Sequence, residues 1–83
     1  MNVTLSKEAA KTLNGMDSVT KERIKKALRK IPKGDIIPMQ GFSDGRLRLR
    51  IGKYRAVFIY FTDQDGKQAA NVIDIDSRGG IYK

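Results

Sequence analysis

The sequence contains no cysteine and no histidine among its 83 residues. Because a small domain without cysteine has no disulfide to support its core, the disulfide-framework class of secreted proteins is excluded. Zinc sites in proteins are built mainly from cysteine and histidine, and acid–base catalysis most often uses an imidazole. We therefore expect no metal site, no cofactor and no histidine-dependent catalysis.

Long hydrophobic runs are also missing. No apolar segment approaches the roughly 20 residues that cross a bilayer, and the opening "MNVTLSKEAA" lacks the pattern of a signal peptide. Hydrophobic residues still make up 40% of the chain, which is enough for a folded core. The sequence thus predicts one small soluble domain over residues 1–83, located in the cytoplasm, with no membrane partner.

Acidic residues are scarce relative to basic ones. The chain has 17 lysines and arginines against 9 aspartates and glutamates, which gives a formal net charge of +8. A field of that sign attracts phosphate backbones and acidic proteins. It favours a polyanionic partner, although charge alone leaves RNA, DNA, an anionic membrane and an acidic protein open.

The hydrophobic periodicity predicts an α+β domain with the order β-α-α-β-β-β. Ser6 suits the N-cap of a first helix, Asp17 or Ser18 that of a second, and Pro32 stops the second helix. Since the apolar residues of each helix fall on one side, we expect a helical hairpin packed on one face of a small twisted antiparallel sheet. The expected segments are a strand at 1–5, a first helix within 7–16 that ends at the "NG" of 14–15, a second helix at 17–31, a loop at 32–45, and strands at 46–51, 54–62 and 68–76. The helix residues expected in the core are Ala9, Leu13, Met16, Ile24, Ala27, Leu28 and Ile31.

The segment "RLRLRIGKYR" alternates arginine with apolar residues before a two-residue turn. Gly52 followed by Lys53 suits a type II′ hairpin, in which Arg50 would lie directly opposite Arg55. The apolar face of this hairpin, expected beneath the helices, comprises Leu47, Leu49, Ile51, Tyr54, Ala56 and Phe58. The other side, which we call the arginine face, comprises Arg46, Arg48, Arg50 and Arg55.

Such alternation is equally typical of a sheet face that is merely exposed to solvent. Two features of the arginine face favour a function: every charged residue on it is arginine, and two like charges face each other although this destabilises a sheet. Guanidinium groups bind phosphate bidentately and stay charged at any workable pH, so we interpret the face as a phosphate-binding surface. Val57, Ile59 and Phe61 share this side, so part of it is expected to be covered by the C-terminal tail or a partner.

The C-terminal segment "DSRGGIYK" adds Arg78 and Tyr82, joined by glycines that allow a sharp turn. The phenol and ring of Tyr82 suit an RNA site, by proton transfer or by base stacking. It is equally consistent with the sequence that Tyr82 is only an amphipathic residue that anchors the end of the chain.

Taken together, these segments resemble bacterial toxins of the RelE/ParE superfamily, and the RelE-like branch most closely. The resemblance covers nearly the whole chain and rests on "LSKEAAKTLNGMDSVTKERIKKALRKI", "RLRLRIGKYRAVFIY" and "VIDIDSRGGIYK". It implies two helices on a twisted antiparallel sheet, and a toxin held in check by a cognate antitoxin. It also implies an endoribonuclease that cleaves mRNA in the ribosomal A site by metal-free attack of a 2′-OH, with the ribosome (rRNA) and mRNA as partners.

The resemblance also implies roles for particular residues. Arg55 and Arg78 would neutralise charge that develops on the phosphate, and Tyr82 would orient the 2′-OH, stack a base or transfer a proton. Arg46 and Arg48 would bind the RNA backbone and rRNA and stabilise the leaving oxygen. The expected catalytic residues are therefore Arg46, Arg48, Arg55, Arg78 and Tyr82, and the expected RNA-binding residues are Arg46, Arg48, Arg50 and Lys53.

This sequence departs from the family at the position of the base. RelE-like members often carry lysine where Arg46 and Arg48 stand, and some relatives use histidine and glutamate. Arginine is never deprotonated in proteins, so neither residue is a credible general base. Tyr82, Lys53, Lys83 or a ribosomal group remain for that role.

Two alternatives to the cleaving enzyme stay open on the sequence. A ParE-like inhibitor of DNA gyrase would share the fold and act by binding. A non-catalytic basic RNA-binding protein would show RNA affinity with a steep salt dependence and no cleavage.

Overall fold

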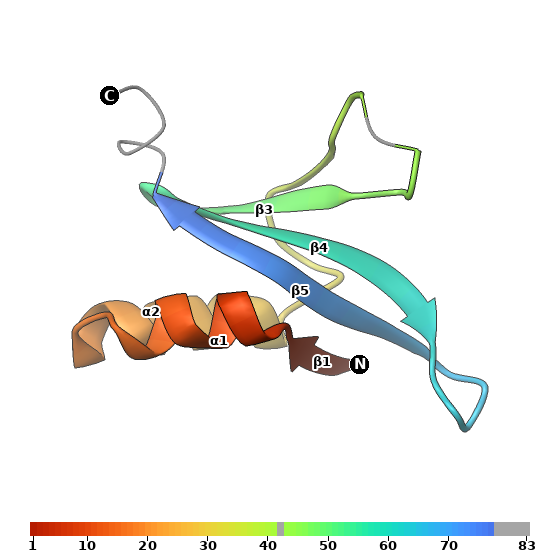
Figure 1. Ribbon diagram of the computed structural model, residues 1–83, viewed down its shortest axis with the longest axis horizontal. Helices are drawn as coiled ribbons and strands as arrows, with labels where there is room; N and C mark the ends of the chain where they lie inside the picture. The colour runs from red at the N-terminus through yellow and green to blue at the C-terminus, as the bar shows by residue number, and fades with distance from the viewer. Residues whose placement is uncertain (42, 78–83) are drawn as a thin grey trace.

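The computed structural model describes residues 1–41 and 43–77. The chain folds into two helices that lie on one side of a five-stranded sheet, which confirms the predicted α+β class and the helical hairpin on one sheet face (Figure 1). In chain order the elements are β1 (Asn2–Leu5), α1 (Lys7–Asn14), α2 (Ser18–Arg29), β2 (Ile36–Pro38), β3 (Leu47–Ile51), β4 (Tyr54–Thr62) and β5 (Gln68–Ser77). No helix in the described ranges is long and apolar enough to span a bilayer.

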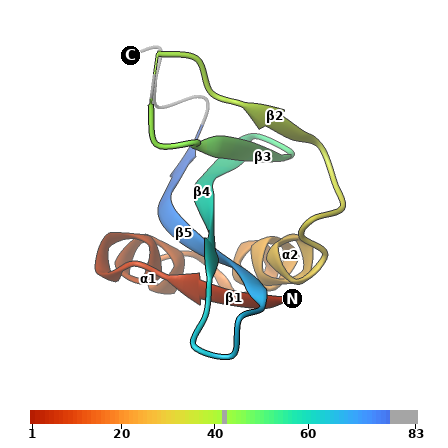
Figure 2. The ribbon, with the colours of Figure 1, turned by 90° about the vertical axis from the view of Figure 1, so that its right-hand side faces the viewer.

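The sheet has the spatial order β1-β5-β4-β3-β2 and differs from the prediction in two ways. First, β1 pairs with β5 in parallel, so the sheet is mixed and not purely antiparallel. Local periodicity indicates a strand but not the strand it pairs with. After β1 the two helices lead the chain to β2 at the opposite edge of the sheet, and β3, β4 and β5 then follow in order back to β1. Second, residues 36–38 of the predicted loop form the edge strand β2 against β3, visible in Figure 2. Pro38 fits there because an edge strand tolerates a residue without an N–H.

The predicted β3–β4 hairpin is confirmed residue by residue. Ile51 pairs with Tyr54, Arg50 with Arg55, and the register continues to Leu47 opposite Phe58. Gly52 has φ +59°, and Lys53 is not in the positive-φ region, which is the pattern of a type II′ turn. Glycine is needed at this first turn position because a side chain there would be strained.

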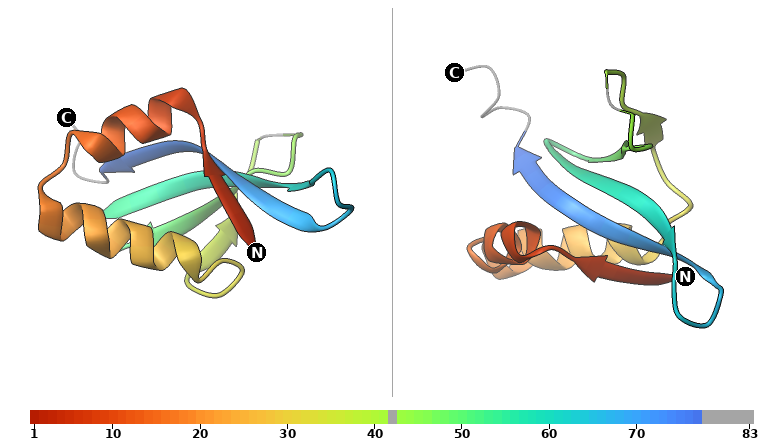
Figure 3. Two further views of the ribbon diagram at one scale, coloured as in Figure 1. Left: turned by 90° about the horizontal axis from the view of Figure 1, so that it is seen from below. Right: turned by 45° about the vertical axis from the view of Figure 1, so that its right-hand side comes forward.

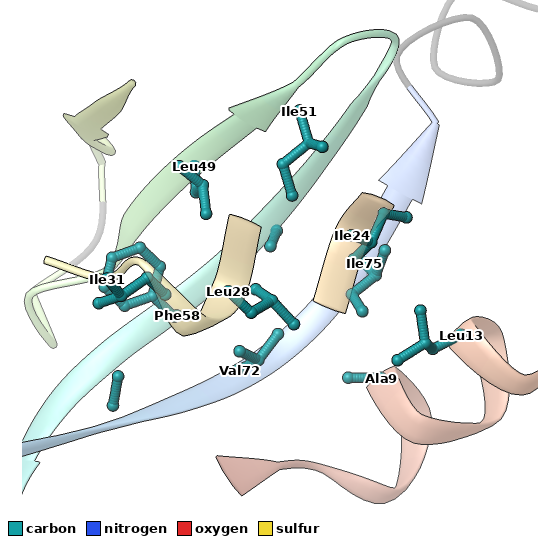
Figure 4. Packing of buried hydrophobic residues seen from close by; sticks show 12 residues of the cluster. Ala9, Leu13, Ile24, Leu28, Ile31, Leu49, Ile51, Phe58, Val72 and Ile75 are labelled. Atoms are coloured by element: carbon teal, nitrogen blue, oxygen red, sulfur yellow. The ribbon is translucent and has the colours of Figure 1, made fainter. Parts of the chain in front are cut away.

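A single apolar cluster lies between the helices and the sheet, as Figure 4 shows. The cluster contains Ala9, Leu13, Ile24, Leu28, Ile31, Leu49, Ile51, Ala56, Phe58, Ala70, Val72 and Ile75. Met16, Ala27, Leu47 and Tyr54 pack against it while remaining partly exposed. The predicted core positions of both helices and the predicted apolar face of the hairpin are thereby confirmed. The arginine face is left on the opposite side of the sheet from the helices, whose placement Figure 3 shows.

A β-bulge in β5 determines which face its aspartates occupy. Val57 pairs with Asp74 but Phe58 pairs with Val72, so Ile73 is an extra residue without a partner on β4. Strict alternation would place Asp74 on the core side together with Val72, since side chains two residues apart share a face. The bulge shifts the alternation by one residue. As a result Val72 and Ile75 are both buried in the core. Asp74 and Asp76 lie on the opposite side of the sheet, together with the arginine face.

Ser6 connects the first helix to this bulge. Its Oγ accepts a hydrogen bond from the Ala9 N–H (3.1 Å) as the N-cap of α1 and donates one to the Ile73 carbonyl (2.6 Å). Its backbone N–H donates to the Val72 carbonyl (2.8 Å). The Ser6 hydroxyl therefore provides a hydrogen-bond partner for one N–H of α1 and for one carbonyl of β5.

Replacing Ser6 by alanine is expected to lower the free energy of unfolding by about 1–2 kcal/mol, because the N-cap is lost and the Ile73 carbonyl loses a partner. Chemical denaturation monitored by circular dichroism measures the change. Ser18→Ala is the matched control, since Ser18 is exposed at the first position of α2 and the N-cap there is Asp17. Equal losses in the two variants would show that the link between α1 and the bulge contributes nothing.

Candidate nucleic-acid interface

The sheet brings three of the predicted arginines onto one surface. Arg48 and Arg50 come from β3 and Arg55 from β4, and the register places all three on the side away from the core. Arg46 comes just before β3, not within it. Lys53 does not join this group: it is exposed in the β3–β4 turn, and its Nζ lies 5.6 Å from the centroid of the Tyr54 ring in a cation–π contact.

The directly opposed pair of arginines is flanked by acidic residues. Arg50 Nε lies 3.7 Å from an Asp35 carboxylate oxygen, and an Arg55 terminal nitrogen lies 3.9 Å from Asp76. The row across the strands is therefore acid, arginine, arginine, acid, which offsets the repulsion that two facing cations would otherwise cause. Both ion pairs are longer than hydrogen bonds, so the guanidinium groups keep donors for another acceptor.

Two guanidinium donors are buried without a partner. The Nε atoms of Arg48 and Arg55 are inaccessible to solvent, and neither forms a hydrogen bond to any residue in the described part of the chain. Buried donors without partners are uncommon in folded proteins because each costs free energy. Arg48 lies between Ile37 of β2 and Val57 of β4 in the register, so no neighbouring side chain in its row supplies an acceptor. The two donors face the same side of the sheet.

Arg46 is held in the loop that leads into β3. Its Nε donates to an Asp44 carboxylate oxygen at 2.8 Å, and its carbonyl accepts a hydrogen bond from the Met39 N–H at 2.9 Å. The hydrogen bond from Arg46 lowers the pKa of Asp44. Arg46 therefore sits at the border of the arginine face with an acidic partner of its own.

Apolar side chains adjoin the arginines, as predicted for this side of β4. Val57 is buried, Ile59 is partly exposed, and Phe61 and Ile37 are each 37% exposed. A cleft of about 340 Å³ next to Arg48 is lined by Ile37, Pro38, Met39, Gln40 and Arg48. An apolar wall beside a guanidinium can receive a stacked base together with its phosphate. The C-terminal tail that was expected to cover part of this surface, with Arg78 and Tyr82, lies outside the described residues.

The two flanking aspartates were missed by reasoning from sequence. Asp76 is brought beside Arg55 only because of the bulge, which no pattern in "NVIDID" reveals by itself. Asp35 lies in the segment predicted as a loop and is fixed by the Arg50 N–H, which donates to its carbonyl at 3.0 Å. Within residues 1–41 and 43–77, no group of three or more acidic side chains is placed to hold a metal ion.

Comparison with known proteins relates this arrangement to a solved toxin–antitoxin complex. No protein-family model and no curated protein matches the sequence. A chain in the crystal structure of the intact E. coli RelBE toxin–antitoxin complex is similar in structure, with a TM-score of 0.56 and 22% sequence identity. The match covers 92% of this chain and 94% of that one. At this identity the likeness establishes the architecture: the chain has a RelE-like fold, with two helices on a five-stranded mixed sheet.

Proposed function

We propose that this chain is the toxin of a type II toxin–antitoxin system, and that it inhibits translation as a ribosome-dependent endoribonuclease acting on A-site mRNA. One observation carries the proposal. On a RelE-like fold, Arg48, Arg50 and Arg55 gather on the helix-free side of the sheet, and two of their Nε donors are buried there without acceptors. Phosphate oxygens are the acceptors that such a group of guanidiniums fits best.

The proposed reaction is an attack of a ribose 2′-OH on the adjacent phosphate. A bond forms between the 2′ oxygen and phosphorus, the bond to the 5′ oxygen breaks, and the products are a 2′,3′-cyclic phosphate and a 5′-OH. Negative charge grows on the phosphoryl oxygens during this step, and fixed cations there lower the barrier. We assign this role to Arg55 and, from the resemblance, to Arg78. Arg48 and Arg46 bind the backbone next to the leaving oxygen.

Proton transfer needs a group other than these arginines, because a guanidinium keeps its proton. Tyr82 is our candidate, with a ribosomal group as the other source. The arginines would then act by position and charge, and much of the rate would come from holding the 2′-OH in line with the phosphate.

A cognate antitoxin is the proposed protein partner. The E. coli chain of similar fold was solved in a toxin–antitoxin complex. The arginine face offers clustered positive charge next to the exposed apolar side chains of Ile37 and Phe61. An acidic segment with apolar anchors complements such a surface, and covering it would block RNA.

Asp76→Asn is expected to strengthen RNA binding several-fold, because it removes the negative charge that lies 3.9 Å from the Arg55 guanidinium. The same change leaves Arg50 and Arg55 opposed with one carboxylate fewer, so the free energy of unfolding should fall by about 0.5 kcal/mol. Fluorescence anisotropy with a short RNA and chemical denaturation measure the two effects. Asp65→Asn, at an exposed position in the β4–β5 turn, removes the same charge far from the arginines and serves as the control. Equal affinity in the two variants would contradict the assignment of Arg55 to the RNA site.

Mapping mRNA 5′ ends after induction of the chain in a bacterial host tests the proposed function. New 5′ ends confined to translated regions, in phase with codons, are the expected result. Intact mRNA together with gyrase-linked DNA breaks would replace the proposal by a ParE-like inhibitor. RNA binding with intact mRNA and intact DNA would replace it by a non-catalytic RNA-binding protein.

A further inference from the structure

A second group of cations lines a cleft on the helix side of the molecule. The cleft has a volume of about 310 Å³ and lies between α2 and β3. Its basic residues are Arg23, Lys26, Lys30, Lys33 and Arg50. The other lining residues are Ala27, Gly34, Leu49 and Ile51. The candidate interface on the opposite sheet face does not include the four cations from α2 and the turn after it.

These four cations are exposed. In the described ranges the ion pairs involve Arg46, Arg50 and Arg55, and none involves Arg23, Lys26, Lys30 or Lys33. The Arg23 side chain reaches the β3–β4 turn, where its Nη1 lies 4.0 Å from the position of a Cβ added at Gly52. Cations that line one cleft repel one another, and a bound polyanion would relieve that repulsion.

The cleft has an apolar floor, and five cations surround it. Leu49 and Ile51, which line it, are only 2% and 6% exposed, and their side chains belong to the core. The exposed large apolar residues of the described chain, Met1, Leu5, Val19, Ile37 and Phe61, all lie elsewhere. The cations of the cleft supply the phosphate contacts that a nucleic-acid strand needs.

The spacing along α2 also suits a strand. Arg23, Lys26 and Lys30 lie three and four residues apart, on one side of the helix. They extend over about 10 Å of helix axis at 1.5 Å per residue. A row of this length can contact more than one phosphate of a nucleic-acid strand. Arg50 continues the series, because it both lines the cleft and pairs with Arg55 across the hairpin.

We infer that this cleft is a second RNA-binding site, which holds the phosphate backbone of an RNA segment while Arg48 and Arg55 engage another segment on the far face. RNA as the source of the phosphates rests on the proposed function. Arg50 at the edge of β3 joins the two surfaces. The cleft would supply affinity and orientation without taking part in cleavage, since its cations from α2 and the following turn lie on the helix side of the sheet.

The test compares two double variants with the same loss of charge. Lys26→Gln with Lys30→Gln removes two cations from the cleft, and Lys7→Gln with Lys67→Gln removes two exposed cations outside it. Glutamine is compatible with a helix, so folding should be retained. Binding of a 20-nucleotide single-stranded RNA is measured by fluorescence anisotropy over a range of salt concentrations, and binding of a polyglutamate peptide is measured in parallel.

The cleft variant is expected to bind this RNA about tenfold more weakly near 0.15 M salt, and to reduce the slope of log K against log[salt] by about 1.4, since each single-strand phosphate contact contributes about 0.7. The control variant should keep both values close to wild type. Equal losses in the two variants, or a loss of polyglutamate binding with unchanged RNA binding, would overturn the inference. Because the readout is binding, a chain that fails to cleave mRNA can still pass or fail this test.

Discussion

Arg55→Ala is expected to reduce the rate of ribosome-dependent mRNA cleavage by about 10²–10³-fold, the loss typical when one preorganised donor to a developing negative charge is removed. Arg55 combines three properties that favour this role. It is central in the sheet on β4, its side chain is only 23% exposed, and its Nε is buried without a partner. A rigid, desolvated guanidinium stabilises charge more strongly than a mobile surface cation.

Two further variants separate this effect from a general loss of charge. Arg29→Ala removes an exposed arginine from the end of α2, which is in the other layer of the molecule, and should leave cleavage within about twofold of wild type. Arg55→Lys keeps the charge but loses the planar fork, so partial activity is expected. Rates are measured under single-turnover conditions, with circular dichroism to confirm folding. An Arg55→Ala protein that cleaves as fast as Arg29→Ala would remove Arg55 from the mechanism.

Phe58→Ala is expected to lower the free energy of unfolding by about 3–5 kcal/mol, the usual cost of emptying a fully buried phenylalanine site. Phe58 is fully buried, packs beneath the helices and meets the ring of Tyr60 edge-on at a centroid distance of 5.4 Å. At about 0.05–0.15 kcal/mol per residue, a chain of this length has a total of only about 4–12 kcal/mol. The variant should therefore be largely or partly unfolded at 37 °C.

Phe61→Ala is the matched control on the same strand. Phe61→Ala is the same substitution three residues along the strand. The Phe61 side chain, however, is 37% exposed on the face opposite the helices. Its loss should cost at most about 1 kcal/mol, because little area is returned to water. Thermal unfolding by calorimetry or circular dichroism compares the two. Similar midpoints would mean that the core does not lie between the helices and the sheet.

The hairpin was predictable because its information is local. A strict two-residue alternation with glycine in the turn fixes the strands, the turn type and the register at once. The helix caps at Ser6 and Asp17 were predictable for the same reason, since each side chain bonds within its own first turn.

Features that depend on distant parts of the chain were not predictable. The parallel pairing of β1 with β5 joins residues such as Val3 and Ala70, and no local pattern links them. The strand β2 has only three residues and exists because β3 offers a free edge. The placement of Asp76 beside Arg55 depends on the bulge at Ile73, so the acidic flanks of the arginine row emerged only from the structure.

Primer extension on a defined mRNA, in a reconstituted translation system with the purified chain, tests the central claim most directly. We expect cuts at codons in the A site of paused ribosomes, no cuts in the same mRNA without ribosomes, and greatly reduced cutting by Arg55→Ala. Intact mRNA on paused ribosomes, at concentrations where the chain is bound to them, would contradict it.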